Sequence, residues 1–253
     1  MKTNFFYIVL IFFISCKKTS NISPYLNVYN DIEYVGINTC KQCHMDIYNT
    51  FIKNGMGKSY NVAQKEFSSS DFKHPIFDSI LGFHYFPKWI DNELFLNEYQ
   101  LKSNDTVFSL KTKIDYIVGS GNHTNSHIIN SNGYLYQAPF TFYTQDSILD
   151  FPPGFEYGNN SRYDRKIGLE CMSCHNAFPH FNLGSENKFE KIPSGIDCER
   201  CHGPGNLHVA NIQSGQLVDT SKFFDYSIVN PINLSIELQN ELCSRCHVQG
   251  NSV

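Results

Sequence analysis

One pentapeptide pattern, Cys-x-x-Cys-His, occurs four times in this chain of 253 residues. The chain has nine cysteines, and all except Cys16 fall in these pairs, each followed at once by a histidine. The four copies are Cys40/Cys43/His44, Cys171/Cys174/His175, Cys198/Cys201/His202 and Cys243/Cys246/His247. Because every remaining cysteine is used in the same way, the pattern indicates one chemistry repeated four times.

This pattern is typical of covalent haem attachment. Two thiols three positions apart project from the same side of one helical turn, so both can add to the vinyl groups on one edge of a porphyrin. The histidine that follows then lies beneath the ring, where its imidazole can ligate the iron. We therefore predict four haem c groups, and the proximal iron ligands are His44, His175, His202 and His247.

Three other uses of paired cysteines fit the pattern less well. A disulfide framework suits an oxidising compartment, but it needs no histidine after every second cysteine. Two zinc sites could be drawn from four cysteines each, but they would leave four regularly placed histidines unused. Thioredoxin-like redox chemistry usually employs one Cys-x-x-Cys pair in a chain and not four. Haem attachment is the leading interpretation, and zinc is its strongest rival.

The N-terminus reads as an export signal. Lys2 is followed by an apolar run from Phe5 to Ile14, which is too short to cross a membrane. Cys16 comes directly after it and resembles the lipidated first residue of a mature lipoprotein. We expect a lipoprotein-type signal peptide (1–15), a linker (16–33) and an exported protein on the periplasmic side or in the cell envelope, anchored through Cys16. An ordinary cleaved signal and an uncleaved anchor are the alternatives.

The haem motifs are unevenly spaced along the chain. The first stands alone near residue 40, whereas the other three crowd into residues 171–247. Between them, aromatic and β-branched residues separated by turn residues predict strands. These are Gly82–Trp89, Glu93–Leu101, Val107–Val118 and His127–Tyr143, with a type I′ hairpin turn at Asn132-Gly133. We expect an isolated haem 1 segment (34–76), a β-rich insert (77–150) and a cluster of haems 2–4 (151–253).

Helices are expected to be short and to gather at the haem motifs. Ser235 can cap a helix over Ile236–Cys243, and Met45–Lys53 can continue from the first motif. Phe151–Gly154 and Gly203–Gly205 contain proline and glycine and are predicted to be loops. The predicted fold class is α+β and loop-rich, as in multihaem cytochromes, where porphyrins replace much of the side-chain core.

Some of the remaining residues can supply the sixth ligand of an iron. The candidates are His208, His123, His127, His180 and Met56, whereas His74 and His84 stay open between a ligand and an ordinary polar role. His208 comes first, because it follows the third motif after a rigid Gly-Pro-Gly turn and can reach a neighbouring haem. His123 and His127 lie in a glycine- and asparagine-rich loop between predicted strands. Met56 can ligate iron through its thioether.

The motifs resemble those of the cytochrome c-554-like family, whose namesake is a tetrahaem electron carrier that works with hydroxylamine oxidoreductase. The resemblance extends over Val35–Val253 and is closest to the N-terminal haem region of multihaem proteins that continue into tetratricopeptide repeats. It implies that His208 is a distal ligand of a neighbouring haem. In the family a Trp and then His residues often follow the first motif. Here Phe51 takes the place of the Trp and Gly55-Met56 stands where the His would be.

Electron transfer between redox partner proteins outside the cytoplasm is the leading functional hypothesis. The second hypothesis is an enzyme that acts on a small nitrogen or sulfur compound at a haem with an open sixth position. The third is sensing or scaffolding by a haem region that regulates C-terminal repeats, since the sequence ends six residues beyond His247 and a truncated chain is expected. The net charge of −4 and the lack of a basic block argue against nucleic acid as a partner.

Overall fold

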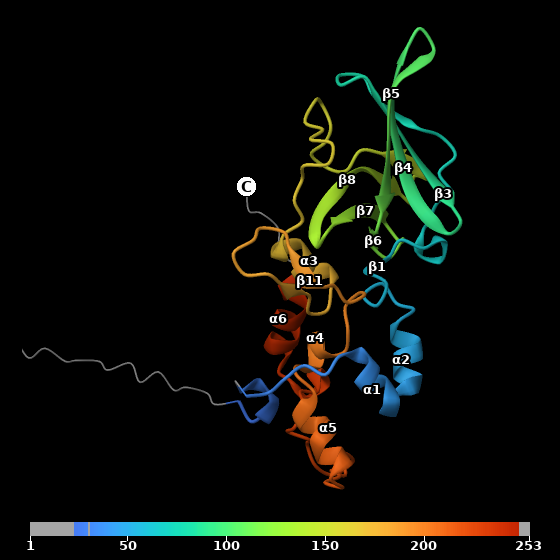
Figure 1. Cartoon of the computed structure of the whole chain (residues 1–253). Helices are drawn as coiled ribbons and strands as arrows, with labels where there is room; N and C mark the ends of the chain where they lie inside the picture. Colours follow the sequence, from blue (N-terminus) through green and yellow to red (C-terminus); the bar gives the residue numbers. More distant parts are fainter. Residues whose placement is uncertain (1–22, 30, 248–253) are drawn as a thin grey trace, which may run out of the picture.

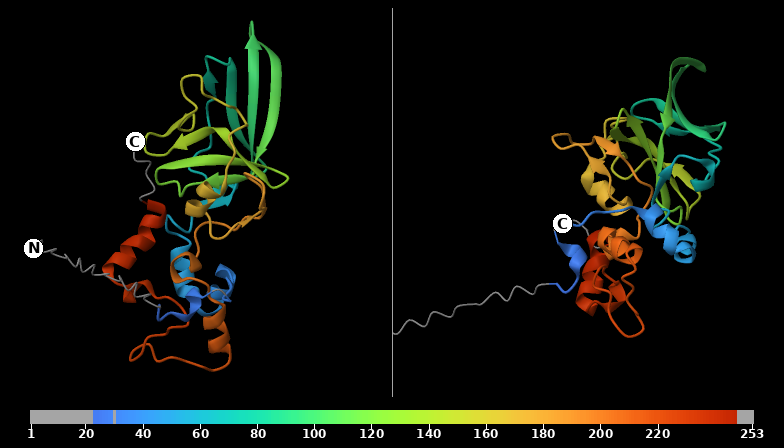
Figure 2. Two further views of the ribbon diagram at one scale, coloured as in Figure 1. Left: turned by 90° about the vertical axis from the view of Figure 1, so that its left-hand side faces the viewer. Right: turned by 60° about the horizontal axis from the view of Figure 1, so that its bottom comes forward.

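The computed structural model describes residues 23–29 and 31–247, and it divides into a β-rich part and a helical part. The strands gather in the upper half of Figure 1 and most helices in the lower half. The turned views of Figure 2 keep this division. The expected signal peptide, Cys16 and the last six residues lie outside the described residues. Within the described ranges, no helix is long and apolar enough to cross a membrane.

Two antiparallel sheets form the β-rich part. The five-stranded sheet has the order β1-β6-β7-β8-β9, and the four-stranded sheet has the order β2-β3-β4-β5. Their strands are β1 (Tyr60–Val62), β2 (Ile76–Asp78), β3 (Phe83–Ile90), β4 (Glu93–Lys102), β5 (Asp105–Ile114), β6 (Tyr116–Val118), β7 (Thr124–Ser131), β8 (Tyr134–Tyr143) and β9 (Ile148–Asp150). A small separate pair is made by β10 (His180–Phe181) and β11 (Phe189–Lys191).

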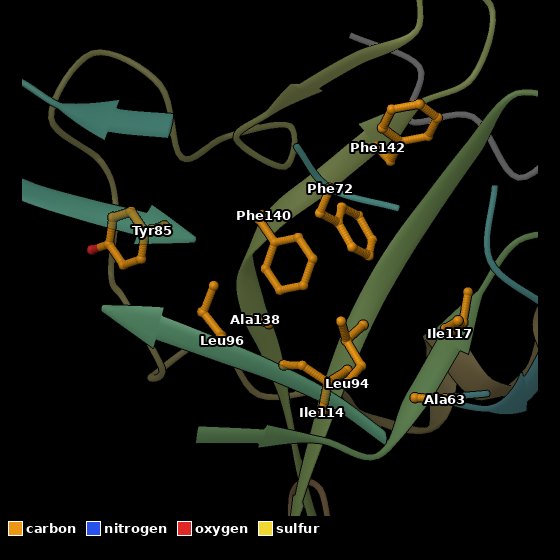
Figure 3. Packing of buried hydrophobic residues seen from close by; sticks show 10 residues of the cluster. All are labelled: Ala63, Phe72, Tyr85, Leu94, Leu96, Ile114, Ile117, Ala138, Phe140 and Phe142. Carbon is orange, nitrogen blue, oxygen red and sulfur yellow. The ribbon is translucent and has the colours of Figure 1, made fainter. Parts of the chain in front are cut away.

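The core lies between the two sheets, as Figure 3 shows. Strand β4 alternates strictly, so Leu94, Leu96 and Glu98 are buried while the residues between them face outwards. Phe140 and Phe142 from β8, together with Phe72 from the loop before β2, complete the same cluster. The buried Glu98 carboxylate accepts a hydrogen bond of 2.7 Å from the Arg162 guanidinium, which ties the loop before the second haem motif to this core.

The predicted strands are present with small shifts at their ends. The long predicted strand Val107–Val118 is divided at Asp115 into β5 and β6, which belong to different sheets. The predicted strand His127–Tyr143 is the β7–β8 hairpin, which begins at Thr124. Its turn has positive φ angles at Asn132 (54°) and Gly133 (91°), as a type I′ turn requires, so that prediction is confirmed.

The β-rich part extends into the segment expected to hold haem 1. Strand β1 pairs with β6 through Tyr60 and Val118, although β1 lies before residue 77. The same segment also contacts the chain just before the third motif, because Tyr60 accepts a backbone hydrogen bond of 2.7 Å from Gly195 and Met56 accepts one of 3.1 Å from Ile196. The chain therefore enters and leaves the β-rich part at neighbouring points.

Short helices carry the haem motifs, as predicted, and the α+β fold class is confirmed. They are α1 (Ile37–Cys43), α2 (Met45–Phe51), α3 (Leu169–His175), α4 (Glu199–His202), α5 (Asn206–Gln213) and α6 (Ile236–His247). The Ser235 hydroxyl accepts a hydrogen bond of 3.4 Å from the Leu238 backbone, so this residue caps α6 as expected. Helix α6 continues beyond the predicted Cys243 through the whole fourth motif.

Part of the segment expected to be a linker (16–33) is docked on the protein. Asn27 lies in a short 3-10 helix (Leu26–Val28) and is fully buried. Its side-chain amide donates to the backbone carbonyls of His202 at 2.9 Å and of Pro204 at 3.1 Å. The described part of this segment is therefore fixed against the third haem motif, because a buried amide with two acceptors holds its position.

Candidate haem-binding site

The first and third haem motifs lie in direct contact. A hydrogen bond with Cys198, together with burial, raises the pKa of the Cys40 thiol, and the same bond lowers the pKa of Cys198. This hydrogen bond places a haem-attachment thiol of the first motif next to one of the third motif. The contact is continued by the backbone of residues 35 and 36, which bonds to Glu199 within the third motif.

The expectation of an isolated haem 1 is therefore wrong. The chain between the first and third motifs, residues 60–195, begins and ends at neighbouring points, so the β-rich part lies beside these two motifs and does not separate them. The hydrogen bonds from Gly195 and Ile196 to Tyr60 and Met56 close this loop just before the third motif begins. The first and third motifs are therefore close in space although they are far apart in the sequence.

The second, third and fourth motifs also touch one another. Burial raises the pKa of the Cys246 thiol, and its neighbour Cys174 raises it further. Burial likewise raises the pKa of Cys201, to which Cys243 and Cys246 add. The guanidinium of Arg200 donates to the Ser173 carbonyl. The third motif therefore contacts the first, the second and the fourth, and the second also contacts the fourth.

The imidazole of His202 is held in a form suited to binding iron. Its Nδ1 lies 2.8 Å from the carbonyl oxygen of Val229, which makes Nδ1 the donor and leaves Nε2 with a free lone pair. Metal-binding histidines commonly donate their second ring nitrogen in this way, which fixes tautomer and ring orientation. The third motif therefore fits a haem iron at Nε2.

His44 and His208 face each other at a distance that suits two ligands of one iron. Their ring centroids are 6.4 Å apart and their ring planes differ by 18°. Two imidazoles on opposite sides of a metal have centroids about 6 Å apart, because each metal–nitrogen bond is about 2 Å long. The Nδ1 of His208 lies 3.0 Å from the Asp225 carboxylate and 3.3 Å from the Ser227 hydroxyl, which leaves its Nε2 available for iron.

A groove beside His175 lies between α3 and the five-stranded sheet. Its lining consists of Tyr60, Val118, Ser126, Ile128, Gln137, Ile167, Cys171, Met172 and His175. The attachment residues of the second motif thus stand at one side of an apolar groove, which fits the flat face of a porphyrin. The sheet side of the lining offers the hydroxyls of Tyr60 and Ser126 and the amide of Gln137, but no histidine or methionine.

His127 is not a loop residue, and that prediction is wrong. It lies within β7, where the neighbouring Ser126 and Ile128 face the groove beside His175. Because strand residues alternate between faces, His127 points into the opposite core, stacked on Phe140 at 4.1 Å between ring centroids. Burial lowers the pKa of His127 to about 3. This placement directs the imidazole away from the second motif.

The other candidate ligands are not brought to an iron-binding motif by any contact of the described residues. His123, His180 and His74 are exposed, and the side chain of Met56 is also exposed, in the turn after α2. His84 is stacked between Phe77 and Tyr99 on the outer face of the four-stranded sheet. Their role as ligands stays a prediction.

Three residues at the site escaped sequence reasoning. Asp225, Val229 and Glu199 orient His208, His202 and the first motif through hydrogen bonds. The only signal for Glu199 is its place inside the third motif, and Asp225 and Val229 lie in a loop without any recognisable pattern. All eight paired cysteines are free thiols, and in the described ranges no three His, Cys, Asp or Glu side chains converge as metal ligands.

The family model described as cytochrome c554 and c-prime matches residues 156–203. This segment contains the whole of the second and third Cys-x-x-Cys-His motifs. The match confirms the predicted resemblance to cytochrome c554-like multihaem proteins and supports haem c as the cofactor, which is consistent with electron transfer. The relation to proteins with tetratricopeptide repeats stays a prediction.

Two solved structures are similar to the chain at low identity. The outer cell wall cytochrome OcwA is 17% identical with a TM-score of 0.47, over 85% of this chain and 37% of that one. An undecahaem cytochrome from the S-layer of Carboxydothermus ferrireducens is 14% identical with a TM-score of 0.41, over 88% of this chain and 26% of that one. The chain thus spans well under half the length of either protein. No curated protein matches the sequence.

Proposed function

We propose that this chain is a tetrahaem c-type cytochrome that passes electrons between redox partner proteins outside the cytoplasm, held at a membrane through lipid on Cys16. The observation that carries the proposal is the unbroken contact between all four motifs. Cys40 hydrogen-bonds to Cys198, the Arg245 guanidinium donates to the Arg200 carbonyl at 2.5 Å, and Cys246 hydrogen-bonds to Cys174. A conduit of adjacent haems needs this continuity, because electrons must step from each haem to the next.

The residues around the motifs supply binding and orientation. Haem c, when bound, supplies the one-electron chemistry of its iron. The paired thiols hold it covalently, and His44, His175, His202 and His247 provide the proximal nitrogens. The Val229 carbonyl and the Asp225 carboxylate fix the protonated nitrogen of His202 and of His208, so that each presents Nε2. The partners at either end of the conduit are redox proteins. The net charge of −4 argues against nucleic acid as a partner.

Haem counting tests the proposal directly. We expect the mature protein, produced with a haem-attachment system and purified, to contain four covalent haems by pyridine haemochrome assay and intact mass. Replacing Cys171 and Cys174 together by alanine is expected to leave three. The Cys16→Ala variant is the matched control, because it removes a cysteine outside the motifs and should keep four haems while leaving the membrane fraction. Two bound zinc ions or a haem-free chain would contradict the proposal.

The groove beside His175 favours a second candidate function, the redox conversion of a small nitrogen or sulfur compound. With no imidazole or thioether on the sheet side of the lining, haem 2 is the haem expected to keep an open sixth position. We expect carbon monoxide to shift the reduced spectrum of one haem in four. That shift should vanish when Cys171 and Cys174 are replaced by alanine. If none of the four reduced haems binds carbon monoxide, the enzyme hypothesis is wrong and electron transfer is the remaining function.

A further inference from the structure

The carboxylate of Glu199, within the third motif, is buried and accepts three backbone hydrogen bonds. Glu199 is 2% exposed. Oε1 accepts from Val35 at 2.9 Å and from Gly205 at 2.8 Å, and Oε2 accepts from Gly36 at 2.7 Å. Hydrogen bonds to an ionised acceptor are about twice as strong as neutral ones. The carboxylate therefore holds the backbone at residues 35, 36 and 205 in place.

The three donors come from the starts of two helices. Gly36 is the N-cap residue of α1, which leads into His44, and Gly205 is the N-cap residue of α5, which carries His208. One side chain from α4 therefore holds the two helices whose imidazoles face each other at 6.4 Å. The third motif, which binds its own haem, thus also sets the geometry of haem 1.

Glycine at both ends makes this close approach possible. Gly36 has a φ of +80°, a left-handed conformation that side chains rarely adopt. A Cβ at position 205 would come within 3.2 Å of Glu199 Oε1 and of a Val35 methyl group. Glycine thus suits position 36 through its backbone conformation and position 205 through the small space beside the carboxylate.

We infer that Glu199 is a positioning residue that holds His44 and His208 on opposite sides of the iron of haem 1. This inference rests on the proposed function, because it assumes that the first motif binds haem. Loss of the carboxylate leaves buried N–H groups without an acceptor, so the helix starts separate to find water. His208 is then released from the iron, while the covalent thioether bonds keep the haem attached.

The Glu199→Gln variant tests the inference at constant size. Its side-chain oxygen can still accept, but its amide nitrogen cannot accept from Gly36. We expect four covalent haems and one additional haem per chain that binds carbon monoxide in the reduced state, with loss of one low-spin signal in the electron paramagnetic resonance spectrum. Glu199→Asp keeps the charge but is one methylene shorter, and we expect the same gain. An unchanged low-spin population in both variants would overturn the inference.

Two further variants separate the possible failures. Glu241→Gln removes an exposed carboxylate two residues before the fourth motif, and we expect no new carbon monoxide binding. His208→Ala removes the distal imidazole itself. If His208→Ala opens haem 1 but neither Glu199 variant does, the positioning role is wrong and the ligand pair stands. If His208→Ala has no effect, the ligand pair is wrong as well. A haem-free first motif would overturn the proposed function.

Discussion

Replacing His208 by alanine is expected to convert haem 1 completely from a six-coordinate to a five-coordinate haem. The reason is geometric, because the His208 ring lies 6.4 Å from the His44 ring and its Nδ1 is held 3.0 Å from Asp225. The ring contact of His44 in the described structure is with His208. About a quarter of the total haem should therefore become high-spin and bind carbon monoxide after reduction, which absorbance and electron paramagnetic resonance spectra would measure.

The control for this change is Gln213→Ala, which removes an exposed side chain at the end of α5, the helix that carries His208. We expect its spectra to match those of the wild type. Asp225→Asn should give an intermediate result, since an amide oxygen can still accept from His208 Nδ1 but carries no charge. The assignment fails if the His208 and Gln213 variants have the same spectra.

Local features of the fold could be predicted because they depend on neighbouring residues. The hairpin at Asn132-Gly133 follows from two residues that tolerate positive φ, and the start of α6 follows from the Ser235 hydroxyl. The Cys-x-x-Cys-His motifs set attachment chemistry within one helical turn. Each of these signals is complete within a few residues, so the sequence was sufficient.

The arrangement of the motifs could not be predicted, because it depends on contacts between the chain after the first motif and the chain before the third. Pairing of β1 with β6, and the bonds of residues 195 and 196 to residues 60 and 56, bring the first motif back to the third. No residue pattern marks these contacts, since backbone groups make them. The buried Asn27 is a similar case, because its acceptors are carbonyls about 175 residues away.

His208 and His127 show why counting histidines gave ligand candidates but not ligands. Both were plausible from their sequence neighbourhood. The difference lies in Asp225 and Ser227, which turn His208 towards His44, and in Phe140, against which His127 packs. An imidazole binds iron only where its other nitrogen has a partner and Nε2 faces the metal. Tertiary contacts decide the orientation of each imidazole. They leave His208 facing His44, and they pack His127 in the core.

Acidification is expected to destabilise the protein through His127, and His127→Leu is expected to remove much of that effect. Burial lowers the pKa of His127 from 6.5 to about 3, and its Nε2 has no hydrogen-bond partner. The unfolded chain takes up a proton near pH 6.5, whereas the folded protein does so only near pH 3. Stability is therefore highest above pH 6.5 and falls between these values, by about 1.4 kcal/mol per pH unit.

Urea unfolding of the haem-loaded protein at pH 7 and pH 4 would measure this loss. Between these two conditions we expect the wild type to lose about 3 kcal/mol more free energy of unfolding than His127→Leu. Leucine has a similar volume to histidine and suits the aromatic surroundings formed by Phe72 and Phe140. His123→Leu is the control, because it removes an exposed imidazole, and this variant should follow the wild type. Equal losses in the wild type and His127→Leu would show that another group governs the acid sensitivity.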